Sequence, residues 1–137
     1  MSDMKSFMSR FVEFINTASP ILAQELIAPD ARFHVPGQPE PLSGPDGYLA
    51  IIAMMRSGFS SVKWQIEDMV AENETIAARF TMRGTHDGHF MGVPATGRPI
   101  QVQAINFYRL AAGKIVEEFG QPDMMGLMMQ IGALPRP

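Results

Sequence analysis

Cysteine is absent from this chain of 137 residues. Without thiols the protein cannot form disulfides, use a thiolate nucleophile or hold zinc through cysteine. Its histidines and carboxylates lack the short helical spacing of a zinc site, and phosphate-loop, dinucleotide and serine-hydrolase signatures are also missing. We therefore expect a protein that works without a metal or another cofactor.

Clusters of basic residues and long apolar runs are missing as well. Lys and Arg number 11 against 14 Asp and Glu, a net charge of −3, whereas binding to a phosphate backbone requires a basic patch. No apolar run approaches the roughly 20 residues that span a bilayer, and charges interrupt the first segment, unlike a signal peptide. These absences predict no nucleic-acid partner, no membrane association and a cytoplasmic location.

Apolar residues, in contrast, are plentiful: they make up 46% of the chain, and charged residues 18%. A chain of this size can bury most of its surface around one core, so we expect a single domain over residues 1–137. Apolar residues at helical spacing predict helices near 7–18, 21–29, 46–57 and 124–131. Alternating apolar and polar residues predict strands near 31–35, 62–67, 75–85, 100–110 and 114–119.

The order of these elements predicts an α+β fold: three helices, a four-strand antiparallel meander and a short closing helix. With the strand at 31–35 on one edge, a curved antiparallel sheet can wrap around the three N-terminal helices as a cone with an internal pocket. The convex face of such a sheet commonly pairs, which predicts a homodimer. Four of the 12 methionines crowd the closing helix, where flexible thioethers suit core or dimer contacts, or adaptation to a ligand.

Many residues at fixed offsets in the second half resemble the SnoaL-like polyketide cyclases, also called ester cyclases. These residues are Gly84, Thr85, His86, Gly88, Phe90, Met91, Gly92, Pro94, Thr96, Gly97, Arg98, Gly113, Lys114, Ile115, Val116, Glu117, Gly126, Leu127, Gln130, Gly132, Ala133, Leu134 and Pro135. The resemblance implies the NTF2-like cone and cofactor-independent chemistry inside it. In that chemistry a general base removes an acidic proton beside a carbonyl, and the enolate closes a polyketide ring by intramolecular aldol addition.

One position departs from the family pattern. The resemblance implies a catalytic aspartate directly after the aromatic position that Phe119 occupies, but this chain has Gly120 there. The aldol mechanism loses the side chain on which it most depends. Three functions therefore stay open: a cyclase-type enzyme acting on a small apolar or polyketide-like carbonyl compound, a hydrolase or isomerase in the same cone, and a non-catalytic small-molecule-binding protein.

Two residues are candidates for proton transfer in place of the missing aspartate. Glu118 has the parity of Gly120 on its strand, so it can face the cone interior, where loss of water would raise its pKa. The alternative is a solvated carboxylate on the strand. His34 stands at a position that in related sequences commonly faces the cavity, and its imidazole could exchange a proton there. It could equally be a structural histidine bonded to the backbone.

Four further residues are candidates for binding a substrate. Asn106 and Tyr108 share a strand face and can hydrogen-bond a carbonyl or enolate oxygen, although either can instead serve the core. Trp64 offers a flat wall for an aromatic ligand, or ordinary packing. Arg79, beside Glu118 or Asp123, could position a water or a ligand carboxylate, which the hydrolase hypothesis requires. The default for Arg79 is a side chain facing solvent.

The segment from Gly84 to Arg98 has three glycines and a proline before its final Gly-Arg pair, which allow backbone turns that other residues resist. It either covers the mouth of the pocket or is only a tight connection between strands. His86 is expected to fix this loop. Asp123 is expected to cap the last helix, because a carboxylate just before a helix accepts its free N–H groups.

Overall fold

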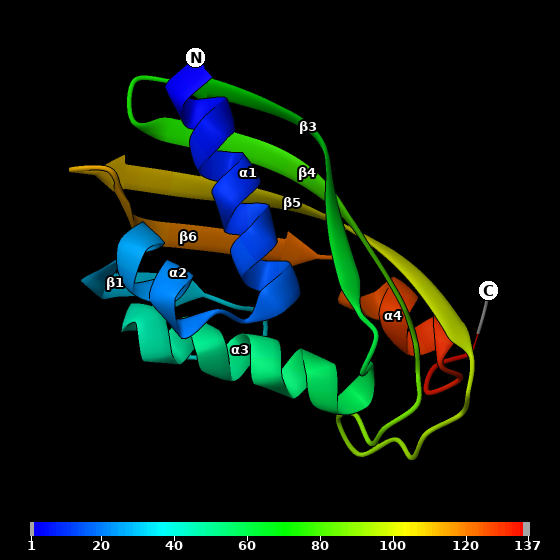
Figure 1. Cartoon of the computed structure of the whole chain (residues 1–137). Helices are drawn as coiled ribbons and strands as arrows, with labels where there is room; N and C mark the ends of the chain where they lie inside the picture. Colours follow the sequence, from blue (N-terminus) through cyan, green and yellow to red (C-terminus); the bar gives the residue numbers. More distant parts are fainter. Residues whose placement is uncertain (1, 136–137) are drawn as a thin grey trace.

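One six-stranded sheet curves around the helices in the computed structural model, which describes residues 2–135 (Figure 1). The helices are α1 (Ser2–Thr17), α2 (Pro20–Leu26), α3 (Gly44–Gly58) and α4 (Met124–Gln130). The strands are β1 (Ile27–His34), β2 (Leu42–Ser43), β3 (Lys63–Glu72), β4 (Thr75–Thr85), β5 (Pro99–Ala111) and β6 (Lys114–Pro122). The predicted α+β cone is confirmed. Among the described residues, every helix is too short or too polar to cross a membrane.

The strands lie in the order β2-β1-β6-β5-β4-β3. The last four form the predicted meander, since β3–β4, β4–β5 and β5–β6 are antiparallel neighbours. The strand β1 instead lies parallel to β6, so the sheet is antiparallel apart from this pair. This pairing joins the first third of the chain to its last strand. The inner faces of β1 and of the meander therefore border the same interior of the cone.

The strand β1 begins earlier than predicted, because α2 ends at Leu26 and not near Pro29. Ile27 pairs with Ile115 of β6, and regular pairing resumes only at Arg32. Pro29 lies inside the interrupted stretch, where its missing N–H breaks no ladder hydrogen bond. Tertiary pairing with β6 thus extends the strand through a proline that was predicted to end a helix.

The helix α1 lies across the concave side of the sheet (Figure 1). Its inward residues Met8, Phe11, Phe14 and Ile15 are all buried, and the last three belong to the apolar stripe that the helical spacing predicts. The ring of Phe11 meets both Tyr48 of α3 and Tyr108 of β5 edge-on, at centroid distances of 5.5 and 5.3 Å. These contacts hold α1, α3 and the sheet in one core.

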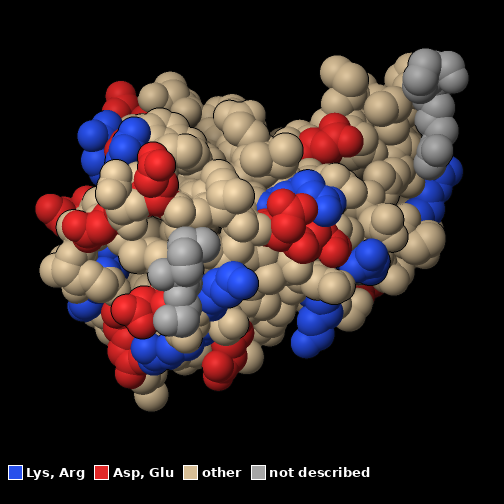
Figure 2. Space-filling view, turned by 90° about the horizontal axis from the view of Figure 1, so that it is seen from above, with Lys and Arg blue, Asp and Glu red and all other residues tan. Residues whose placement is uncertain are grey.

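A second apolar cluster closes the other end of the sheet. Phe59, Phe90, Leu127 and Ile131 are buried there, which attaches α4 and the loop between β4 and β5 to the end of α3. As predicted, Asp123 caps α4: its Oδ1 accepts a hydrogen bond from the N–H of Gly126 at 2.9 Å. On the face shown in Figure 2, positive and negative side chains are interspersed, and neither sign forms a continuous patch.

Candidate functional site

A cavity of about 400 Å³ lies between α3, the concave face of the sheet and α4. Its walls are mostly aliphatic, methionine and aromatic side chains contributed by α1, α3, α4 and strands β3 to β6. The polar side chains in the lining are Gln38, Tyr48, Asn106, Tyr108 and Glu118. An apolar space of this size with a few convergent polar groups is typical of a small-molecule site.

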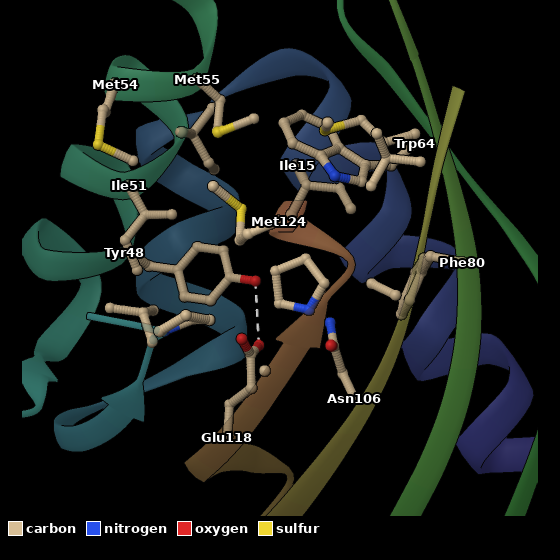
Figure 3. Close-up of a pocket in the computed structure, with 18 of the residues that line it drawn as sticks. Ile15, Tyr48, Ile51, Met54, Met55, Trp64, Phe80, Asn106, Glu118 and Met124 are labelled. Atoms are coloured by element: carbon tan, nitrogen blue, oxygen red, sulfur yellow. Dashed lines mark hydrogen bonds between the residues drawn. The ribbon is translucent and has the colours of Figure 1, made fainter. Parts of the chain in front are cut away.

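Glu118 is the carboxyl group in the lining of this cavity. The side chain is 4% exposed because alternation along β6 directs residue 118 inward and its neighbours 117 and 119 outward. The hydroxyl of Tyr48 donates a hydrogen bond to its Oε1 atom at 3.0 Å. Tyr48 and Asn106 flank the carboxyl group on two sides (Figure 3).

Burial raises the pKa of Glu118 from 4.5 to about 7. Loss of water penalises the charged form and is the largest cause. Hydrogen bonding from Tyr48 and Tyr108 stabilises the carboxylate and partly offsets the rise. A carboxyl group with this pKa is present in both protonation states near neutral pH, so it can take up a proton and return it.

Two hydrogen bonds hold Asn106 and Tyr108 beside Glu118. Asn106 lies on the same inner face, where its Nδ2 donates to the hydroxyl of Tyr108 at 3.1 Å, and its Oδ1 accepts from the N–H of Gln121 at 3.1 Å. Tyr108 lies directly opposite Glu118 in the β5–β6 register. Burial, followed by the nearby charge of Glu118, raises the pKa of both Tyr48 and Tyr108 well above the usual 10, so both hydroxyls stay protonated.

Gly120 lies opposite Asn106 and also lines the cavity. A Cβ atom on residue 120 would lie 3.3 Å from Oε2 of Glu118 and 3.7 Å from Oδ1 of Asn106. The position that the resemblance assigns to the aspartate therefore opens onto the same polar cluster. Glu118 reaches this cluster from two residues earlier on the strand.

Trp64 and several methionines form the apolar part of the lining. Trp64 lies near Ile15 and across from Met55, at the end of the cavity away from Glu118 (Figure 3). Met54 and Met91, both exposed, contribute from α3 and from the loop between β4 and β5. This loop therefore supplies one side chain to the cavity, while His86 holds it: the ring Nδ1 lies 2.9 Å from Oγ1 of Thr96.

Two sequence candidates lie outside this lining. Phe33 takes the inner face of β1, so His34 is directed outward, where its ring stacks on Phe119 at 4.5 Å and its Nε2 lies 2.8 Å from Oε2 of Glu117. Arg79 likewise faces outward and donates to Asp68 from its Nε at 3.0 Å. The structure thus brings Glu118, Asn106, Tyr108 and Trp64 together, and it leaves His34 and Arg79 on the outer side of the sheet.

Tyr48 and Gln38 are polar residues of the lining that the sequence did not single out, and Tyr48 is the one that bonds to Glu118. It belongs to the apolar stripe of α3, where a tyrosine looks like core, and its ring does pack against Phe33 at a centroid distance of 4.7 Å. The hydroxyl reaches Glu118 only because the fold brings residues 70 positions apart into contact. Among the described residues there is no group of three or more His, Asp and Glu side chains that could hold a metal ion.

A curved sheet that encloses a cavity against three helices is the NTF2-like class of fold. Within this class the chain belongs to the SnoaL-like polyketide cyclase family, whose sequence model matches residues 5–131. The aklanonic acid methyl ester cyclase DauD of Streptomyces sp. (strain C5) is 30% identical over 96% of this chain and 83% of its own length. The nogalonic acid methyl ester cyclase of Streptomyces nogalater is 26% identical over 66% of this chain and 68% of its own.

Solved structures show the same likeness. IdmH from Streptomyces antibioticus has a TM-score of 0.84 and 32% identity, over 93% of this chain and 97% of its own. TsrD from Streptomyces laurentii has a TM-score of 0.85 and 26% identity, over 97% of both chains. The resemblance that the second half of the sequence indicates thus extends over nearly the whole chain.

Proposed function

We propose that this protein closes a ring in a small, apolar carbonyl compound by intramolecular aldol addition, with Glu118 as the general base and acid. The observation that carries this proposal is the buried carboxyl group of Glu118, with a pKa of about 7, in an otherwise apolar cavity. The carboxyl group of Glu118 supplies the proton-transfer group that Gly120 cannot supply. No cofactor takes part in the proposed reaction.

The proposed reaction has three steps. The Glu118 carboxylate removes a proton from a carbon beside one carbonyl of the substrate, which leaves an enolate and a neutral carboxyl group. The enolate carbon then forms a bond to a second carbonyl carbon of the same molecule, whose oxygen becomes an alkoxide. Glu118 returns the proton to that alkoxide, so the ring-closed product contains the same atoms as the substrate.

Asn106 is the proposed donor to the enolate oxygen. Its Nδ2 carries two N–H bonds, and the Tyr108 hydroxyl accepts one of them. The second can serve an oxygen of a ligand in the cavity. Because the Gln121 N–H holds the other end of the amide, Asn106 does not have to reorganise when charge develops on that oxygen.

The names of the relatives support a polyketide-like ester as the substrate. Two of them are cyclases of aklanonic acid methyl ester and nogalonic acid methyl ester. The mostly apolar lining suits an uncharged polycyclic compound, because removing apolar area from water drives binding. Trp64 provides a flat surface for such rings.

The experiment is a cyclisation assay with aklanonic acid methyl ester as the first substrate. Glu118→Gln should lower kcat by about 100-fold or more, since general acid–base catalysis contributes that much or more. Glu117→Gln is the matched control, because residue 117 faces outward beside His34, and it should stay within about twofold of the wild type. Equal rates for the wild type and Glu118→Gln would contradict the role of Glu118. Tight binding of the ester without ring closure would identify a non-catalytic binding protein instead.

The hydrolase or isomerase alternative receives less support. It requires Arg79 and a carboxylate to hold a water together, but Arg79 pairs with Asp68 on the outer side of the sheet. The guanidinium group of Arg79 thus lies on the opposite face of the sheet from Glu118. We retain ring closure as the function that fits the side chains in the cavity.

We also propose a homodimer formed through the outer face of the sheet. Five residues that are successive partners in the strand register form a row across β1, β6, β5, β4 and β3. They are His34, Phe119, Phe107, Ala77 and Val70. Phe107, Phe119, Val70 and the adjacent Ile105 are exposed. Charged groups of both signs border this apolar row, with Arg109 and Glu117 on one side and Arg79 and Asp68 on the other. A second copy offers the same apolar row and a complementary set of charges.

A further inference from the structure

The side chain of Asn16, near the end of α1, bonds to both main-chain polar groups of Trp64. Its Nδ2 donates to the carbonyl oxygen of Trp64 at 2.9 Å, and its Oδ1 accepts from the N–H of Trp64 at 2.8 Å. An amide that both donates to and accepts from one residue imitates the pairing of a neighbouring strand. Trp64 is therefore held through its backbone, while its indole is free to line the cavity.

This pairing lies at the free edge of the sheet. The strand β3 is last in the strand order and has β4 as its neighbour on one side only. Trp64 is opposite Met82 of β4, and its N–H and C=O are directed to Asn16 on the open side. Near the start of β3, where an edge strand is otherwise easily displaced, Asn16 replaces the missing neighbour.

Arg56 of α3 joins the same point. Its Nη2 donates to the main-chain carbonyl of Asn16 at 2.5 Å. The ends of α1 and α3 and the start of β3 thus meet in one hydrogen-bonded junction made of Asn16, Arg56 and Trp64. Hydrogen bonds that involve a charged donor are among the stronger ones, so the three elements are held at a defined separation.

Each member of this junction is next to, or is itself, a residue of the cavity lining. Ile15 precedes Asn16, Met55 precedes Arg56, and Trp64 lines the cavity directly. These three side chains form the wall at the end of the cavity away from Glu118 (Figure 3). The junction therefore sets the distance between three parts of this wall.

We propose that Asn16 is a positioning residue for the apolar end of the binding cavity, and that it holds the wall against which an apolar ligand binds there. This inference rests on the proposed function in one respect, namely that the cavity takes an apolar ligand. Asn16 acts through Trp64, Ile15 and Met55 and makes no contact with the ligand itself. The polar cluster around Glu118 is separate from this junction.

Trp64 makes the proposal measurable, because it is the single tryptophan of the chain. Its emission reports its own surroundings, and energy transfer from it to bound N-phenyl-1-naphthylamine, an uncharged apolar probe, reports occupation of the cavity. Asn16→Ala should shift the emission to the red and weaken probe binding by about fivefold to 30-fold, which corresponds to the loss of one or both hydrogen bonds at about 1 kcal/mol each. Asn16→Asp keeps an acceptor for the Trp64 N–H and loses the donor, so its effects should be intermediate.

Thr17→Ala is the matched control, because within residues 2–135 the Thr17 hydroxyl bonds only to the carbonyl of Glu13 one turn back, at 2.7 Å, and to that of Phe14 at 3.5 Å. It should leave both the emission and probe binding unchanged.

Folding is checked by far-ultraviolet circular dichroism, and if Asn16→Ala does not fold, Asn16→Asp is compared with the wild type alone. A folded Asn16 variant with unchanged Trp64 emission and unchanged probe affinity would overturn the proposal. If the wild type does not bind the probe, the apolar-ligand function fails, while a shifted emission still supports the positioning role.

Discussion

Gly120 and Glu118 share the inner face of β6, and a Cβ atom on residue 120 would lie 3.3 Å from Oε2 of Glu118. The carboxyl group of Glu118 thus lies against the place where the side chain of residue 120 would begin. A glutamate here and an aspartate two residues later would put two carboxyl groups into one buried cluster. Glu118 is therefore the proposed functional replacement of the aspartate.

Restoring the aspartate should therefore destabilise the protein in a pH-dependent way. Above about pH 7, Gly120→Asp places two negative charges side by side, and like charges in a buried site oppose ionisation of both. The free energy of unfolding should fall at least about 1 kcal/mol below that of Gly120→Asn at about pH 8. At about pH 4, near the ordinary pKa of both carboxyl groups, the gap between the two variants should be much smaller. Chemical denaturation at both pH values measures this, and an equal gap at both would contradict it.

The raised pKa of Glu118 predicts the pH dependence of stability. The folded protein binds this proton up to about pH 7, whereas the unfolded chain releases it near 4.5. The contribution is therefore complete below about pH 4.5 and is lost as the pH rises to about 7, by about 3 kcal/mol in total. Glu118→Gln lacks this loss, so its stability relative to the wild type should increase by about that amount between about pH 4 and pH 8. A constant difference, measured by urea denaturation, would show that Glu118 has an ordinary pKa.

Tyr48→Phe should raise the pKa of Glu118 further. The Tyr48 hydroxyl stabilises the carboxylate through its hydrogen bond, and phenylalanine keeps the ring packing without that bond. The rate of ring closure should rise with pH as Glu118 ionises, with a midpoint near 7 in the wild type and at a higher pH in Tyr48→Phe. The pH profile of kcat/KM measures the shift. A midpoint that moves to lower pH would contradict the assigned role of the hydroxyl.

The proposed dimer has its own test. Phe107→Glu places a charge in the centre of the exposed apolar row and should convert the dimer to a monomer, because burying an unpaired charge is costly. Lys63→Gln, on the same sheet but at the opposite end of β3 from the apolar row, should leave the dimer intact. Sedimentation velocity over a wide range of concentrations distinguishes the two states. A wild type that stays monomeric throughout would exclude this interface.

The part of the site that could be predicted from the sequence follows from the alternation of side chains along each strand. Because successive side chains of a strand alternate between faces, the parity of Glu118 with Gly120, and of Asn106 with Tyr108, follows from the sequence alone. The order of elements is likewise local information. The order of elements is sufficient to predict the cone fold, although it does not reveal that β1 pairs in parallel with β6.

The other features of the site depend on tertiary contacts that the sequence does not reveal. The Tyr48 hydroxyl bonds to Glu118 across 70 positions, and no spacing in α3 indicates such a partner. His34 was expected in the cavity from its position in related sequences, but Phe33 is buried on the inner face of β1. The outward direction of His34 follows from that burial. The Asn16–Trp64 pairing depends on the end of α1 reaching the free edge of β3, which the sequence does not reveal.

Titration of Glu118 itself measures whether its carboxyl group can carry out the proposed proton transfer. Carbon-13 NMR of glutamate side-chain carboxyl groups, assigned by comparison with Glu118→Gln, follows ionisation of this one residue without any substrate. We expect a midpoint of about 7, which should shift when an apolar ligand occupies the cavity and removes water around the carboxyl group. A midpoint near the ordinary value of 4.5 would show that the carboxyl group is solvated, and it would contradict Glu118 as the residue that takes up and returns the proton.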